Sequence, residues 1–119
     1  MARDAPQVDA YGEGGFRVSG ARREGSLLIL EDQAHDWPVR NPAELDVASL
    51  APVLSAGRAK VEFLLLGMGR ANALPTREVR DAVRAAGLGL EFMDTASAAR
   101  LYNVLTSEGR RLAAALIAI

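Results

Sequence analysis

The stretch LGLEFMDTASAARLYNVLTSEGRRLAAALIAI, residues 88–119, decides the fold because it contains the patterns of a strand, a helix and a second strand. Apolar and polar side chains alternate over 88–93, which is typical of a half-buried strand. The spacing of apolar residues predicts a helix over 95–107, and a continuous apolar run predicts a strand over 112–118. A right-handed crossover makes the two strands of such a unit parallel.

The helix over 95–107 has one apolar face and a signal at each end. The apolar face follows three- and four-residue spacing and consists of Ala98, Leu101, Tyr102 and Leu105. Asp94 or Thr95 can cap the start, because their side-chain oxygens accept hydrogen bonds from free backbone N–H groups. Gly109 marks the end of the helix. Asn103 points about 100° away from Tyr102 around the helix axis, so it lies outside the apolar face.

The residues before this stretch add a second unit of the same kind. The run VEFLLLG is continuously apolar after its second residue and predicts a strand over 61–66 that is covered on both faces. Thr76 can cap a helix over 76–86, which Gly87 ends. Two consecutive units therefore predict three parallel strands in the C-terminal half.

The N-terminal third is rich in glycine and predicts an antiparallel hairpin. The segments FRVSG (16–20) and SLLIL (26–30) have strand patterns, and AHDWPV (34–39) adds a further extended piece. A short helix is expected from Ser49 to Gly57. The predicted fold class is a three-layer α/β domain with a mixed central sheet, an N-terminal glycine-rich hairpin and a C-terminal βαβαβ half.

Length and composition limit the classes of protein that the chain can represent. The 119 residues suit a single domain over 1–119, with 1–10 expected to be flexible. The net charge of −1 argues against nucleic acid as a partner, and the arginines are scattered along the sequence. The absence of cysteine excludes disulfides and thiolate chemistry. No run approaches the roughly 20 apolar residues of a membrane span, and no signal or transit peptide is recognised, so a bacterial cytoplasmic location is expected.

Ligands of open α/β sheets collect beyond the carboxyl ends of the parallel strands. The residues predicted at those ends are Gly67, Gly69, Arg70, Asp94 and Thr95. Glycines let backbone N–H groups approach an anion, and an arginine supplies a forked donor, so these positions suggest a pocket for a small anion or nucleotide-type ligand. The alternative is that the glycines permit tight turns and that the aspartate only caps a helix.

No arrangement of residues predicts catalysis or metal binding. His35 is the single histidine, and no sequence motif places a serine nucleophile beside it. We therefore name no catalytic residue, no metal ligand and no cofactor. Trp37, next to Pro38, is expected to anchor the N-terminal layer.

Several segments together resemble one known family. They are GGFRVSG, EGSLLIL, WPV, LLLGMG and, above all, EFMDTASAARLYNVLTSEGRRLAAALI. From Tyr11 onward the chain resembles the domain family of uncharacterised function that includes the mitochondrial complex I (NADH dehydrogenase) assembly factor 3, with bacterial and archaeal members. The resemblance implies a three-layer α/β fold with a mixed sheet. The positions that match its motif, none with a catalytic role to carry over, are Gly67, Gly69, Asp94, Thr95, Tyr102 and Asn103.

The resemblance implies a scaffold or assembly role, so the leading hypothesis is a non-enzymatic assembly or interaction factor for respiratory complex I or other membrane-protein subunits. Protein partners are expected, and an open edge strand in the N-terminal hairpin could pair in a homodimer. The alternative hypothesis is a binding protein or enzyme for a small anion or nucleotide-type ligand, which would use the pocket at the strand ends. Tyr102 and Asn103 are counted with Gly67, Gly69, Arg70, Asp94 and Thr95 as candidate residues of this ligand or partner pocket.

Overall fold

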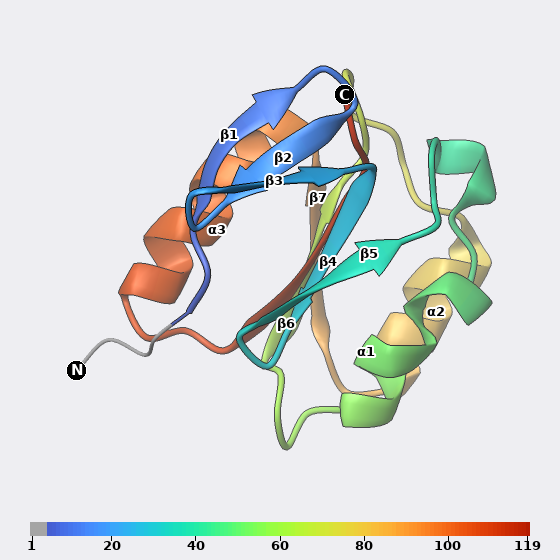
Figure 1. Ribbon diagram of the computed structural model, residues 1–119. Coiled ribbons are helices and arrows are strands. Elements are labelled where there is room, and N and C mark those ends of the chain that lie inside the picture. The colour runs from blue at the N-terminus through green and yellow to red at the C-terminus, as the bar shows by residue number, and fades with distance from the viewer. Residues whose placement is uncertain (1–4) are drawn as a thin grey trace.

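The computed structural model describes residues 5–119, which form eight strands, three α-helices and two short 3-10 helices (Figure 1). The strands are β1 (Val8–Gly12), β2 (Gly15–Val18), β3 (Ala21–Glu24), β4 (Ser26–Leu30), β5 (Gln33–Trp37), β6 (Phe63–Gly67), β7 (Gly89–Met93) and β8 (Leu112–Leu116). The α-helices are α1 (Ala51–Ala56), α2 (Arg77–Ala85) and α3 (Thr95–Ser107), and the 3-10 helices are η1 (Pro42–Glu44) and η2 (Ala48–Leu50).

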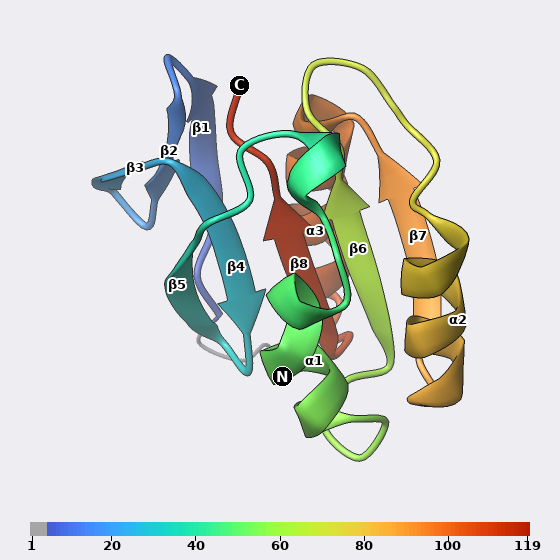
Figure 2. The same ribbon diagram turned by 90° about the vertical axis from the view of Figure 1, so that its right-hand side faces the viewer.

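The central sheet has the strand order β5-β4-β8-β6-β7. β6 is parallel to both β7 and β8, which confirms the three parallel strands predicted for the C-terminal half. β4 is antiparallel to β5 and to β8, so the sheet is mixed. Figure 2 shows β8 in the middle of this sheet. Its sequence LAAAL is buried along its whole length, because layers cover both faces of the sheet.

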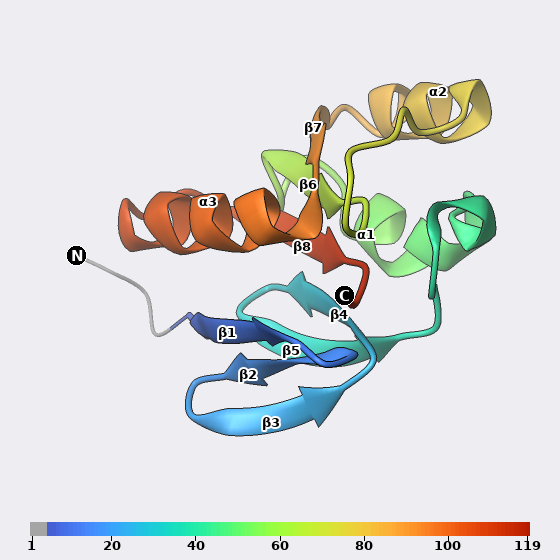
Figure 3. The same cartoon turned by 90° about the horizontal axis from the view of Figure 1, so that it is seen from above.

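The sheet is the middle of three layers, as the sequence predicted. One face packs against α1 and α2 through a core that includes Val53, Val79 and Val83. The other face packs against α3 and a separate sheet of order β1-β2-β3, with Phe16 and Tyr102 in the core between them. Seen from above in Figure 3, α3 and the small sheet lie on one side and α1 and α2 on the other. The predicted α/β class with a mixed central sheet is confirmed.

The N-terminal strands pair differently from the simple hairpin that the sequence suggested. β2 pairs with β1 and β3, whereas β4 pairs with β5 and β8 in the other sheet. The chain passes from β3 into β4 at Gly25, where φ is +81°, a value that glycine adopts without strain. Residues 8–10, expected to be flexible, belong to β1, and residues 1–4 lie outside the described part of the chain.

The predicted helices are present with the expected ends. Thr76 accepts a hydrogen bond from Val79 N–H at 3.3 Å at the start of α2. In α1, Pro52 lies in the first turn, where its missing N–H costs nothing, and Gly57 follows the last turn with φ +67°. No helix within residues 5–119 combines the length and the apolar character needed to cross a membrane.

Candidate functional site

The turns after β6 and β7 lie at one edge of the sheet and are joined through Thr95. Thr95 N–H donates to Gly69 O at 2.8 Å, and Gly69 N–H donates to Thr95 Oγ1 at 2.9 Å. The same hydroxyl donates to Ile117 O, just beyond β8, at 2.7 Å. Thr95 is fully buried. Its hydroxyl therefore links three chain segments and satisfies backbone groups that would otherwise be buried without partners.

The two glycines make this close arrangement possible. A Cβ atom at Gly67 would lie 3.0 Å from Thr95 Cα and 3.0 Å from Leu116 Cδ2, so a side chain there would push α3 away from β6. Gly69 has φ +108°, in the region that favours glycine. Both glycines are accounted for by packing and backbone conformation.

Asp94 caps α3. Its Oδ2 accepts a hydrogen bond from Ser97 N–H at 3.0 Å, and this bond is the largest of the effects that lower the pKa of the Asp94 carboxyl. Nearby Arg70 is exposed and makes no hydrogen bond or ion pair with residues 5–119. Of the residues proposed for an anion pocket, Arg70 is the one whose side chain remains available to a ligand.

Tyr102 and Asn103 lie two turns further along α3, about 12 Å from Asp94, and do not join the strand-end turns. The Tyr102 hydroxyl donates to Pro6 O at 2.7 Å. Asn103 hydrogen-bonds both backbone polar groups of Val8, at 2.9 Å and 2.8 Å. These two side chains therefore fasten the beginning of the small sheet to α3.

His35 and Trp37 occupy β5 away from these turns. His35 is exposed, whereas Trp37 is buried and donates its indole N–H to Ser49 O at 2.9 Å. Trp37 therefore anchors the end of β5 to the segment that leads into α1. Within residues 5–119, no three His, Asp or Glu side chains converge in a way that could hold a metal ion.

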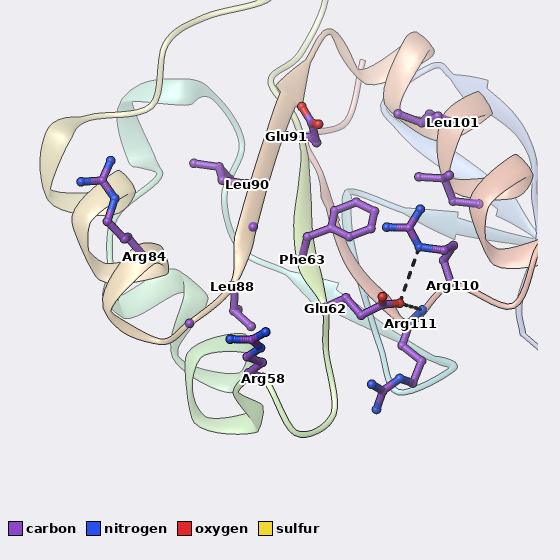
Figure 4. A pocket seen from close by; sticks show the side chains of 13 residues that line it. Arg58, Glu62, Phe63, Arg84, Leu88, Leu90, Glu91, Leu101, Arg110 and Arg111 are labelled. Carbon is purple, nitrogen blue, oxygen red and sulfur yellow. Dashed lines mark hydrogen bonds and ion pairs between the residues drawn. The ribbon is translucent and has the colours of Figure 1, made fainter.

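A groove lies at the opposite end of the sheet, where the parallel strands begin. This groove of about 1090 Å³ runs along β7 between α2 and α3 (Figure 4). We call it the β7 groove. It is lined by Arg58, Glu62, Phe63, Arg84, Gly87, Leu88, Gly89, Leu90, Glu91, Leu101, Leu105, Arg110 and Arg111.

Charged residues at the lower end of the β7 groove form a connected group. Glu62 Oε2 accepts a hydrogen bond from Arg111 N–H at 2.9 Å and lies 3.6 Å from Arg110 Nε. The bond from Arg111 N–H is the main cause of the lowered pKa of Glu62, and the charges of Arg110 and Arg111 add to it. The Arg110 guanidinium also lies 5.2 Å from the centre of the Phe63 ring, in cation–π range.

Two further arginines of the β7 groove have no such partners. The side chains of Arg58 and Arg84 are exposed and make no hydrogen bond or ion pair with residues 5–119. Figure 4 shows Arg84 on α2, across β7 from Leu101 and Arg110, and Arg58 below Leu88, at the end of the groove where β7 begins. The groove therefore combines an apolar floor with an excess of positive charge.

Sequence reasoning did not find the β7 groove. Its residues come from separate segments, and the rule for ligands in α/β sheets directs attention to the other end of the strands. The arginines, which are scattered in sequence, are gathered here by the fold: four of them line one groove.

Solved structures with the same fold place the chain in a structural class. A protein from Bartonella henselae, described as an outer membrane protein, is similar with a TM-score of 0.90 at 29% identity, over 96% of this chain and 95% of that one. A Bordetella pertussis protein described as a Mth938-like domain is similar with a TM-score of 0.81 at 32% identity, over 99% of this chain and 89% of that one. The fold is therefore that of Mth938-like domains.

The chain belongs to the family described as protein of unknown function (DUF498/DUF598), which matches residues 8–117. An uncharacterized protein of Rhodobacter capsulatus is 44% identical over 110 residues, which are 92% of this chain and 82% of that protein. The human NADH dehydrogenase [ubiquinone] 1 alpha subcomplex assembly factor 3 is 30% identical over 118 residues, which are 98% of this chain. The match spans 62% of the human protein. These relatives support the predicted family and, in general terms, an assembly-factor role.

Proposed function

We propose that the chain is a non-enzymatic assembly factor that binds subunits of a respiratory membrane complex while that complex is being built. One structural observation carries the proposal. The β7 groove is a wide surface with an apolar floor and an arginine rim, and it lies beside β7, which within residues 5–119 has no neighbouring strand other than β6. Enclosed clefts are typical of small-molecule sites, whereas an open groove beside a free strand edge is typical of contacts with another polypeptide.

The positions shared with the family motif support the same function. Thr95, Tyr102 and Asn103 use their polar atoms to join elements of this chain to one another. Such residues stabilise the fold and need no reaction to explain them. The proposal assigns partner binding to the surface and fold stability to these internal contacts.

Deletion of the gene in its own organism tests the proposal. We expect less fully assembled NADH dehydrogenase complex on native gels, accumulation of partly assembled complexes, and recovery of both when the chain is supplied again. Assembly and NADH oxidation equal to those of the parent strain would refute the assembly role.

A second function, binding of a small anion at the strand ends, is favoured by Arg70. Its exposed guanidinium lies beside the turn that contains Gly69 and has no partner within residues 5–119. Phosphate and nucleotides should then raise the melting temperature of the protein, and Arg70→Ala should abolish the increase. An unchanged melting temperature with every anion would exclude this second function.

The proposal includes a cytoplasmic location, in which the factor meets its partner at the membrane surface. Cell fractionation tests it, and recovery of the chain in the outer-membrane fraction would contradict it. That outcome is worth testing because the similar Bartonella protein is described as an outer membrane protein.

A further inference from the structure

We propose that the β7 groove receives an extended, acidic segment of a partner protein, which adds to the central sheet as a sixth strand beside β7. The inference rests on the proposed function and goes further, because it names the surface, the binding mode and the chemistry of the partner segment.

The backbone of β7 offers a free edge. Within residues 5–119, β7 pairs only with β6 and forms the end of the five-stranded sheet. Gly89 N–H donates to Glu62 O on the β6 side at 3.1 Å. Because neighbouring residues of a strand point their backbone groups in opposite directions, Leu90 and Phe92 present N–H and C=O groups outward. These groups can pair with an added strand, as unpaired edges do.

The side chains around the edge leave room for such a strand. Gly89 has no side chain, and both Gly89 and Phe63 line the open β7 groove. The Phe63 ring and the side chains of Leu101 and Leu105 line the α3 side of the groove. Apolar side chains on alternate residues of the added strand would cover this surface.

The charges of the β7 groove select an acidic segment. Glu62 partly compensates Arg110 and Arg111, but Arg58 and Arg84 have no acidic partner among the described residues. Glu91 is the one other acidic residue in the lining, so the groove keeps an excess of two positive charges: four arginines against two glutamates. Carboxylates near the beginning of β7 would meet this excess, and guanidinium groups bind carboxylates with a forked geometry.

Glu91 argues against a second copy of this chain as the occupant. It is exposed on β7, and antiparallel pairing of two β7 edges centred on this residue would place two carboxylates opposite each other. Like charges directly opposite in neighbouring strands are destabilising. A different polypeptide, with a neutral or basic residue facing Glu91, avoids this repulsion.

Selection from a random library of ten-residue peptides tests the proposal. The library is passed over Arg58→Glu/Arg84→Glu protein first and then over the natural chain, and the retained peptides are synthesised. We expect enrichment of Asp and Glu on a background of β-branched residues. Enrichment of basic or wholly apolar peptides, or retention of none, would overturn the proposed chemistry.

The selected peptides then identify the surface. We expect Arg58→Glu/Arg84→Glu to weaken binding about tenfold near physiological ionic strength, and Arg17→Glu/Arg77→Glu, which changes exposed arginines outside the groove, to leave it unchanged. Replacing the acidic residues of a peptide by lysine should restore its binding to the Arg58→Glu/Arg84→Glu variant. Equal losses in the two variants would overturn the assignment to the groove.

Hydrogen exchange identifies the binding mode. The amide protons of Leu90 and Phe92 should exchange more slowly in the peptide complex, and N-methylation of alternate peptide residues should abolish binding. Unchanged exchange would overturn strand addition. Protection that instead rises with concentration of the chain alone would assign the edge to a second copy and also overturn the proposal.

The proposal and the assembly function can fail separately. If Arg58→Glu/Arg84→Glu protein restores complex assembly in the deletion strain as fully as the natural chain, the groove proposal fails while the assembly role stands. If deletion leaves assembly unchanged but the peptides bind as described, the assembly role fails while the groove proposal stands.

Discussion

Asn103 on α3 hydrogen-bonds Val8 of β1 twice, with its side-chain oxygen accepting from Val8 N–H at 2.9 Å and its side-chain amide donating to Val8 O at 2.8 Å. The side chain thus pairs with the strand as a neighbouring strand would. It joins the three-stranded sheet to the helix, and it satisfies a backbone donor and a backbone acceptor at a partly buried position.

Asn103→Ala should therefore lower the free energy of unfolding by about 1–3 kcal/mol, because two backbone groups lose their partners. Urea denaturation measures the loss. Asn72→Ala is the matched control, since that side chain is exposed and, among residues 5–119, accepts a hydrogen bond only from its neighbour, Ala73. Equal effects of the two substitutions would contradict the role of the Val8 pair.

Thr95→Val should destabilise the protein more than Thr95→Ser. Valine has the shape of threonine but leaves Gly69 N–H and Ile117 O without the hydroxyl, at a cost of about 2 kcal/mol or more. Serine keeps the hydroxyl and loses one methyl group, at about 1 kcal/mol. Thermal unfolding of the two variants should rank them in this order, and the reverse ranking would show that packing of the methyl group dominates.

Gly67→Ala should destabilise the protein by about 1–3 kcal/mol. Gly67 belongs to β6, which has a neighbouring strand on each side, and the added Cβ would meet the backbone of Thr95 in α3. Gly89→Ala is the comparison, since its Cβ would meet Phe63 from an edge strand, which can move outward. Urea denaturation should give a smaller loss for Gly89→Ala. A loss as large as that of Gly67→Ala would show that β7 is held as firmly as β6.

Asp94 should make the free energy of unfolding depend on pH in the acidic range. The pKa of Asp94 is lowered in the folded protein, mainly by the hydrogen bond from Ser97 N–H. A lowered pKa in the folded state stabilises the protein at pH values above the pKa of an unfolded aspartate, about 3.9. This stabilisation is lost as the pH falls through the pKa of the folded state. Asp94→Asn keeps a capping oxygen but cannot ionise, so its stability should approach that of the natural chain below about pH 4.

Denaturation of both proteins from neutral to acidic pH measures this convergence. Asp94→Ala, which loses the cap altogether, should cost about 1 kcal/mol at neutral pH. If the difference in the free energy of unfolding between Asp94→Asn and the natural chain stays constant across the acidic range, ionisation of the Asp94 carboxyl does not add to stability.

The parallel half of the fold could be predicted because its signals are local. α3 has the predicted range 95–107, since its apolar spacing and its cap at Asp94 lie within one short segment. The N-terminal pairing could not be predicted in the same way. The strand ARRE (21–24) carries mainly exposed polar side chains, and the change of sheet at Gly25 depends on a backbone angle.

The strand-end turns also have local sequence signals and could be predicted, whereas the β7 groove has none. The sequence predicted that the turns at 67–70 and 94–95 would share an edge, and Thr95 joins them there. Whether that edge binds a ligand stays a prediction. No sequence motif marks the β7 groove, because its lining residues come from separate strands, helices and loops that the fold brings together.

The central place of β8 sets the order in which this chain can fold. Of the strands within residues 5–119, β8 is synthesised last, yet it is the one that joins β4 and β5 to β6 and β7. Until residues 112–116 leave the ribosome, the two pairs of strands have no common neighbour and their apolar faces stay open to other chains. Contacts between such distant residues form slowly, so a newly made chain should need protection from aggregation until β8 is in place.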